Sequence, residues 1–209
     1  MNTLTGYIRQ LGTALRFLFF ATLVLGVAYP LAVFGAGQLI APYQANGSII
    51  KDDTGAPAAS ALIAQAAADD AGAQDPRWFH ARPSAVKWDP ASSSASNLGP
   101  NDPKLLDAVA ANRSAVAAAE GVDAAAVPAD AVTASGSGLD PDISPEYAKL
   151  QLERVAAANG LSRDAVASLV EQHTSSGLVA FLGQPSVNVT ALNLAVAAAA
   201  PASQPAQSK

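Results

Sequence analysis

The sequence predicts a single N-terminal transmembrane α-helix followed by a small α+β extracytoplasmic domain. Residues 17–40 contain no ionisable side chain other than that of Tyr29. All seventeen acidic residues lie beyond residue 50, whereas Arg9 and Arg16 are the only charged side chains before it. The rest of the chain alternates turn-forming clusters with helical patterns and short apolar runs. We expect a cytoplasmic N-terminus at residues 1–16, a transmembrane helix at 17–40, a periplasmic domain at 41–196 and a low-complexity tail at 197–209.

The apolar run at residues 17–40 is long enough to cross a bilayer. At about 1.5 Å per residue it spans about 36 Å, against a hydrocarbon core of about 30 Å. Pro30 is tolerated in such a helix, where we expect it to produce a kink. A cleaved signal peptide is the alternative, but its apolar stretch is usually about 7–15 residues and ends at a small-x-small site. Because residues 38–42 contain no clean site of that kind, a retained anchor is favoured.

The basic residues around this run predict its orientation. Arg9 and Arg16 precede it, whereas Lys51 is followed at once by Asp52 and Asp53. Positively charged flanks stay on the cytoplasmic side. We therefore expect the N-terminus in the cytoplasm and residues 41–209 outside it.

The first part of the domain is rich in turn signals. Turns are expected at residues 46–48 and 54–57, where Asn, Gly and Pro cluster. Residues 60–64 predict either a short strand or the start of an alanine-driven helix that reaches residue 68. Periodicity does not distinguish these two alternatives.

The middle of the domain contains one helical pattern between two loops. The Ser-, Asn-, Gly- and Pro-rich residues 91–103 predict a loop. A helix is expected at 104–120, and a second loop with two glycines at 132–144. The apolar anchors expected in this helix are Leu105, Val109 and Val116.

The last third has clearer helix boundaries. Ser144 is a good N-cap, Pro145 suits the first helical turn, and Gly160 can close the helix in a left-handed conformation. Ser162 then caps a second helix, and the alternation at residues 186–190 predicts a strand. The residues expected to face the core are Ala148, Leu152, Val155 and Ala156 in the first helix and Val166, Leu169 and Val170 in the second.

The composition excludes several classes of function. The chain has no cysteine, which excludes disulfides, thiolate metal sites and a cysteine nucleophile. Its formal net charge of −5 argues against nucleic acid as a partner. Its only histidines are His80 and His173, which excludes a histidine-rich metal site. His173 follows the apolar side of a predicted helix and is interpreted as a structural residue.

The motifs that could carry chemistry are incomplete. Neither serine of Ser135-Gly-Ser-Gly138 has the Gly-x-Ser-x-Gly spacing of a nucleophile elbow. Residues 140–146 resemble the start of a calcium loop, which requires glycine at its sixth position and glutamate at its twelfth. Those positions hold Pro145 and Gln151, so Asp140 and Asp142 are better explained as turn formers. The chain also lacks the glycine-rich loop of a nucleotide site.

A series of longer strings carries a resemblance to a known family. They are Tyr-Gln-Ala-Asn-Gly-Ser-Ile-Ile at 43–50, Arg-Pro-Ser-Ala at 82–85, Ser-Asn-Leu-Gly-Pro at 96–100, Val-Pro-Ala-Asp at 127–130, Val-Thr-Ala-Ser-Gly-Ser-Gly-Leu-Asp-Pro at 132–141, Ile-Ser-Pro at 143–145, Phe-Leu-Gly at 181–183, Val-Asn-Val at 187–189 and Leu-Asn-Leu at 192–194. In these strings the chain resembles the C subunit of the bacterial high-affinity potassium-transporting P-type ATPase, the Kdp complex. The chain departs from the family pattern at Ala81, where glycine is usual, and at Asp142, where histidine is common.

The resemblance implies a subunit that is not itself an enzyme. Such a subunit is needed for assembly and activity of an ATP-driven potassium pump and acts as a catalytic chaperone that raises the ATP affinity of the ATPase subunit. It implies a single-pass protein of the bacterial inner membrane, in contact with the lipid bilayer. The implied partners are a channel-like potassium-binding subunit, a P-type ATPase subunit and a small single-helix subunit. The chain would carry no cofactor of its own, and the complex would handle ATP, magnesium and potassium.

We expect no catalytic, cofactor-binding or metal-binding residue in this chain. Two alternatives to the pump subunit remain. One is a membrane-anchored extracytoplasmic module unrelated to transport, and the other is an anchored hydrolase that depends on His173. The residues expected to contact partner subunits or to shape the loops are Arg82, Asn97, Thr133, Ser135, Gly136, Ser137, Gly138 and Asp140.

Overall fold

The computed structural model describes residues 3–52, 54–68, 74–175 and 183–201. The chain divides into two compact units, Met1–Ser48 and Ile49–Lys209. The first unit is helical, and the second contains helices and two small sheets. The predicted combination of one apolar N-terminal helix with a small α+β region is therefore confirmed.

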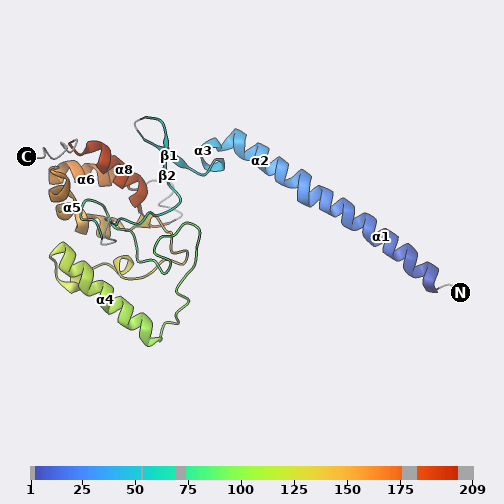
Figure 1. Cartoon of the computed structure of the whole chain (residues 1–209), viewed down its shortest axis with the longest axis horizontal. Coiled ribbons are helices and arrows are strands. Elements are labelled where there is room, and N and C mark those ends of the chain that lie inside the picture. Colours follow the sequence, from blue (N-terminus) through green and yellow to red (C-terminus); the bar gives the residue numbers. More distant parts are fainter. Residues whose placement is uncertain (1–2, 53, 69–73, 176–182, 202–209) are drawn as a thin grey trace, which may run out of the picture. The chain divides into compact units, whose positions relative to one another are not determined.

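The first unit consists mainly of one long helical run, drawn in blue in Figure 1. It comprises α1 (Thr3–Leu23), the π-helical η1 (Val24–Ala28) and α2 (Tyr29–Ile40), after which the short α3 (Pro42–Ala45) follows. Residues 4–40 form a helix of 37 residues with a mean hydropathy of 2.2, long and apolar enough to cross a membrane. The helical run thus begins well before residue 17, where the apolar stretch was expected to start.

The irregular turn in this run lies directly before Pro30. Proline has no N–H, and its ring crowds the carbonyl group four residues earlier, here that of Gly26. In the structure the backbone widens into η1 at this point, and the N–H of Tyr29 donates to the carbonyl of Val24. The disturbance expected around Pro30 therefore takes the form of a π-helical turn, a common cause of helix distortion.

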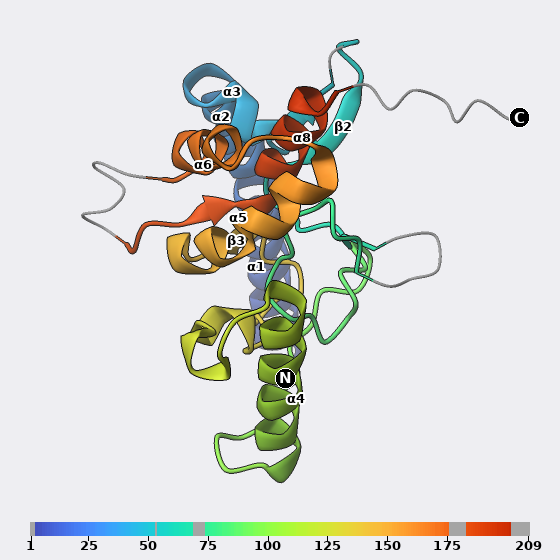
Figure 2. The same cartoon turned by 90° about the vertical axis from the view of Figure 1, so that its left-hand side faces the viewer.

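Three helices form most of the core of the second unit: α5 (Pro145–Asn159), α6 (Arg163–Gln172) and α8 (Val189–Ala199) (Figure 2). The caps expected from the sequence are present. The Oγ of Ser144 accepts the N–H of Tyr147 at 3.0 Å, and the Oγ of Ser162 accepts the N–H of Ala165 at 3.2 Å. Gly160 ends α5 with a φ of 64°. The side chains of α5 and α6 that were expected to face inward are buried or partly buried against the core.

Helix α4 (Pro103–Glu120) is less deeply packed. Its expected bounds are confirmed, with Asp102 as N-cap and Gly121 in a left-handed conformation at its end. None of its residues is fully buried, although Val109 and Val116 pack against the core. Two short 3-10 turns, η2 (Ala124–Ala126) and η3 (Ala129–Ala131), connect α4 to the next loop.

The strands are short and form two antiparallel pairs. Strand β1 (Ile49–Lys51) pairs with β2 (Pro57–Ser60), and β3 (Asp142–Ile143) pairs with β4 (Val187–Asn188). Strand β2 ends where residues 60–64 were expected to begin a strand or a helix, and a turn follows instead. The loop expected at 132–144 contains β3, because its last residues pair with β4.

The C-terminal part differs most from the prediction. Residues 186–190 were expected to form a strand, but only the two residues of β4 do so. Helix α8 begins at once because the Oδ1 of Asn188 accepts the N–H of Ala191 at 2.9 Å. The tail expected at 197–209 is also wrong in its first three residues, which complete α8. Residues 202–209 lie outside the described part of the chain.

Candidate functional site

Two loop regions of the second unit contain its densest polar contacts. The first is the segment of residues 75–80, which we call the pinned segment. The second combines residues 82–94 with residues 133–142, and we call it the loop clasp. Most of the candidate residues proposed from the sequence belong to the loop clasp.

An ion pair joins the two halves of the loop clasp. The Nη1 of Arg82 lies 3.2 Å from the Oδ2 of Asp140, and both side chains are about 30% exposed, at 28% and 30%. The Nη2 of Arg82 donates to the Oγ1 of Thr133 at 3.4 Å. The structure therefore brings together three of the candidate residues, of which Arg82 lies more than 50 positions from the other two.

The serine hydroxyl groups of the loop clasp form hydrogen bonds with backbone groups. The Oγ of Ser135 accepts the N–H of Gly138 at 2.8 Å, and the Oγ of Ser137 accepts the N–H of Leu139 at 3.1 Å. From the other half, the Oγ of Ser84 donates to the carbonyl of Gly138 at 2.7 Å. These bonds stabilise the loop, so the two serines have a structural role here and do not form a nucleophile elbow.

The two glycines of this loop differ. Gly138 has a φ of 70°, and a Cβ atom there would lie 2.5 Å from Val86 and 2.8 Å from the carbonyl oxygen of Ser94. A side chain at this position would therefore separate the two halves of the clasp. A Cβ atom on Gly136 would meet nothing within 4 Å. The structure gives Gly138, but not Gly136, a steric reason to be glycine.

Asn97 lies apart from the contacts that close the clasp. It is exposed and has a left-handed φ of 55°, a conformation that asparagine tolerates. Its side-chain amide donates to the carbonyl of Ala95 within the same loop. Among the described residues, no hydrogen bond joins Asn97 to Arg82 or Asp140.

An open hollow of about 340 Å³ lies beside the ion pair. Its lining includes Asp130, Asp140 and Asp142 together with Arg82. The carboxylate of Asp130 accepts the N–H and the hydroxyl group of Ser144 at 2.7 and 2.9 Å. Burial, followed by the charge of Asp140, raises the pKa of Asp142. The hollow is therefore acidic, but no group of three His, Cys, Asp or Glu side chains in the described residues could hold a metal ion.

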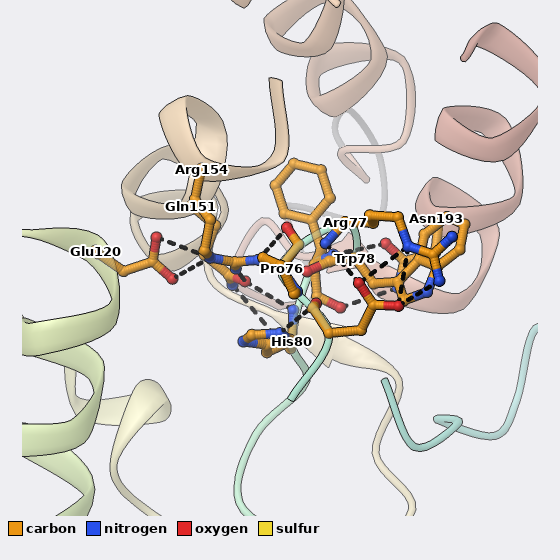
Figure 3. A network of polar contacts seen from close by, with 10 residues as sticks. Pro76, Arg77, Trp78, His80, Glu120, Gln151, Arg154 and Asn193 are labelled. Carbon is orange, nitrogen blue, oxygen red and sulfur yellow. Dashed lines mark hydrogen bonds and ion pairs between the residues drawn. The ribbon is translucent and has the colours of Figure 1, made fainter. Parts of the chain in front are cut away.

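The pinned segment is held by side chains in place of a neighbouring strand (Figure 3). The amide of Gln151 accepts the N–H of His80 at 2.7 Å and donates to its carbonyl at 3.2 Å. The amide of Asn193 does the same for Phe79, at 2.8 and 2.9 Å. One amide from α5 and one from α8 thus satisfy both backbone groups of two consecutive residues, as a paired strand would.

Arg154 completes this network from α5. Its Nε donates to the carboxylate of Glu120 at 2.9 and 3.1 Å, and its Nη1 donates to the carbonyls of Pro76 and Trp78 at 2.8 and 2.9 Å. Figure 3 shows Arg154 extending from Glu120 to the pinned segment. The side chain of Glu120 is 2% exposed, and its burial raises its pKa even though Arg154 opposes the shift.

His80 is the buried titratable group of the pinned segment. Its Nε2 lies 3.0 Å from the carbonyl oxygen of Asp75 and so carries the proton of that hydrogen bond. Burial, followed by the charge of Arg154, lowers the pKa of His80 to about 4. His80 is therefore neutral at neutral pH. His173 ends α6, and its Nδ1 lies 2.8 Å from the carbonyl oxygen of Leu169, which agrees with its structural interpretation.

The sequence did not identify the residues that hold the pinned segment. For two of them the sequence contains a local signal, a polar residue among apolar ones: Gln151 lies on the apolar face of α5, and Asn193 lies between two leucines. No local signal indicates the ion pair of Glu120 and Arg154, because these residues are 34 positions apart. Taken together, the side chains of the two regions fix the backbone of loops.

The chain is similar to known proteins over most of its length. The family model described as "K+-transporting ATPase, c chain" matches residues 11–198. A potassium-transporting ATPase KdpC subunit from Kineococcus radiotolerans is 50% identical over 95% of this chain and 98% of its own length. Those from Polaromonas naphthalenivorans and Caulobacter vibrioides are 48% and 46% identical, over 92% and 86% of this chain and 96% and 88% of their own.

Proposed function

The chain belongs to the KdpC family, the c chains of K+-transporting ATPases, and on this premise we propose that it is a non-catalytic accessory subunit of an ATP-driven, high-affinity potassium uptake pump. The observation that carries the proposal is the extent of the family match. It covers residues 11–198, and so includes most of the long helix as well as the domain. The polar groups of the two loop regions agree with a structural role of these loops, because their hydrogen bonds go to backbone groups.

The proposed location is the bacterial inner membrane, with the helix retained as an anchor. The length and hydropathy of residues 4–40 fit a single-pass protein. The two arginines before the apolar run and the acidic residues after it favour a cytoplasmic N-terminus and a periplasmic domain. ATP would then lie on the side of the membrane opposite to the domain.

The proposed partners are a channel-like potassium-binding subunit, a P-type ATPase subunit and a small single-helix subunit. ATP, magnesium and potassium would be handled by these subunits, and this chain would bind no cofactor. We assign the Arg82–Asp140 pair and the acidic hollow beside it to contacts with a partner. A partly exposed ion pair at the edge of a hollow can exchange partners on docking at small cost.

The proposed effect on ATP affinity is indirect. A periplasmic domain cannot touch a cytoplasmic nucleotide, so the subunit would act by binding one conformation of the pump more tightly than another. A coupling free energy of about 1–3 kcal/mol changes an affinity roughly 5- to 150-fold. In this proposal the long helix is the part of this chain that crosses the membrane. It is therefore the element able to transmit a preference for one conformation of the pump.

The test is an affinity purification of the tagged full chain from membranes of potassium-starved cells in mild detergent. The expected eluate contains two large polytopic subunits and hydrolyses ATP in response to potassium. Adding the chain in increasing amounts to the other subunits should lower the ATP concentration needed for half-maximal hydrolysis. Purification of the chain as a monomer without other subunits would contradict the proposed complex. It would favour the alternative of an anchored module unrelated to transport.

A further inference from the structure

The N-terminal helix is much longer than a bilayer requires. Its 37 residues correspond to about 55 Å, whereas the hydrocarbon core is about 30 Å thick and the bilayer with its headgroups about 40–45 Å. The apolar residues 17–40 suffice for the crossing. Residues 3–16, which add about 21 Å, therefore lie outside the hydrocarbon core. They form the first turns of α1.

These first turns are amphipathic. Leu4, Ile8, Leu11 and Leu15 follow the spacing of four, three and four residues that places side chains on one helical face. All four side chains are more than half exposed. In water, this stripe would expose four apolar side chains. Full burial of each such side chain is favourable by about 1.5–3 kcal/mol of free energy.

Beside the stripe, the same turns carry only positive charge. Arg9 and Arg16 are seven residues apart and so share one face, and Thr13 lies between them. The hydroxyl group of Thr13 donates to the carbonyl of Arg9, and the residues Arg9 and Arg16 are both exposed. No acidic residue occurs in the first 50 residues to neutralise them.

We propose that residues 3–16 form an interfacial anchor in which the stripe Leu4, Ile8, Leu11 and Leu15 rests in the headgroup layer and Arg9 and Arg16 bind the phosphates of anionic phospholipids. An amphipathic helix with basic residues beside an apolar stripe binds anionic membrane surfaces in this way. Tilting of the long helix, or bending at Gly12, brings the stripe to the membrane. Each arginine near an anionic surface strengthens the attraction about fivefold.

This inference goes beyond the pump function and rests only on retention of the helix in the mature chain. Arg9 precedes the part of the chain that the family model matches, which begins at residue 11. The anchor can be tested on the full chain without any partner subunit, so its failure would not affect the pump proposal.

The test uses the absence of native cysteine. The full chain carries one cysteine with an environment-sensitive dye, at position 8 (Ile8→Cys) or at position 13 (Thr13→Cys), in nanodiscs that expose both membrane faces. The nanodiscs contain phosphatidylcholine alone or phosphatidylcholine with phosphatidylglycerol. We expect a blue shift of the dye at position 8 in the anionic nanodiscs, reversed by high salt, and little change at position 13.

Variants separate charge from fold. In the Ile8→Cys chain, the double substitution Arg9→Gln and Arg16→Gln should abolish the shift, whereas Arg9→Lys and Arg16→Lys should retain it. The matched control is Lys104→Gln with Arg113→Gln, which removes the same charge from α4, outside the N-terminal helix, and should leave the shift unchanged. Equal emission at position 8 in both lipids, or a shift that survives the double glutamine substitution, would overturn the proposal.

Discussion

The pinned segment and the loop clasp both consist of irregular backbone, apart from Asp142 in β3, but they are held by different interactions. The pinned segment lies beneath α5 and α8, and its backbone groups are bound by two amides and a buried arginine. The loop clasp is closed by serine hydroxyl groups, one close approach at a glycine and a partly exposed ion pair. The side chains of Arg154 and Glu120 in the first arrangement are 11% and 2% exposed, whereas those of Arg82 and Asp140 in the second are 28% and 30% exposed. We therefore expect substitutions in the network of the pinned segment to affect folding more than substitutions at the ion pair of the clasp.

The largest effect is expected at Arg154 in the pinned segment. Arg154→Met leaves the carboxylate of Glu120 buried and unpaired and removes the donor to two carbonyls. It should lower the free energy of unfolding of the domain by about 3–5 kcal/mol. Urea unfolding of the full chain in detergent, followed by the fluorescence of its two tryptophans, measures this.

The matched control for that variant is Arg163→Met. The side chain of Arg163 is 57% exposed in its pair with Glu153, so the change should be below about 1 kcal/mol. Similar losses in the two variants would contradict the view that the buried network holds the segment.

The next effect is a dependence on pH through His80. Its pKa is about 4 in the folded chain and 6.5 in a free side chain, so the unfolded state binds more protons between these values. Stability should therefore fall as the pH falls from 6.5 to 4, by about 3 kcal/mol in total. His80→Gln keeps a donor to Asp75 but cannot titrate, and urea midpoints across this range should show a flatter profile. Parallel profiles for the two chains would rule out His80 as the cause.

A smaller effect is expected where the two halves of the loop clasp approach most closely. Gly138→Ala places a Cβ atom against Val86 and the carbonyl oxygen of Ser94 in a left-handed conformation, which should cost about 2–3 kcal/mol. Gly136→Ala meets no atom and should stay within about 0.5 kcal/mol of the parent. Thermal unfolding of both variants measures the difference. Equal melting temperatures would show that the loop clasp accommodates the Cβ atom without loss of stability.

The smallest effect on stability is expected at the ion pair of the clasp. Arg82→Gln or Asp140→Asn should lower the free energy of unfolding by less than about 1 kcal/mol, because both side chains are partly solvated. If the pair contacts a partner as proposed, the same variants should reduce the yield of the purified complex or its potassium-stimulated ATP hydrolysis. Arg113→Gln on α4 is the control. Full activity of both clasp variants would assign the pair to loop shape alone.

The sequence predicted the parts of the fold that depend on local signals. Caps at Ser144, Ser162 and Gly160 predicted α5 and α6, and the charge-free stretch predicted the long helix. The strand expected at residues 186–190 is present only at Val187 and Asn188, because the alternation of valines was given more weight than the capping ability of Asn188. That cap is a local signal, and it starts α8 immediately after β4.

The candidate site was predictable only in part. The strings at residues 82–85 and 132–141 identified the two halves of the loop clasp, but not that Arg82 would pair with Asp140. The pinned segment depends on partners 71 and 114 positions away, such as Gln151 with His80 and Asn193 with Phe79. Such contacts arise from the packing of α5 and α8, which no local pattern specifies.

The π-helical turn before Pro30 has a consequence for whatever neighbours the long helix. Such a turn accommodates one more residue than an α-helical turn, and one residue corresponds to about 100° of rotation. The side chains of α2 are therefore out of phase with the continuation of the stripes on α1. A neighbouring helix that follows one side of α1 meets a different side of α2, so the two halves of a single span offer two separate contact faces.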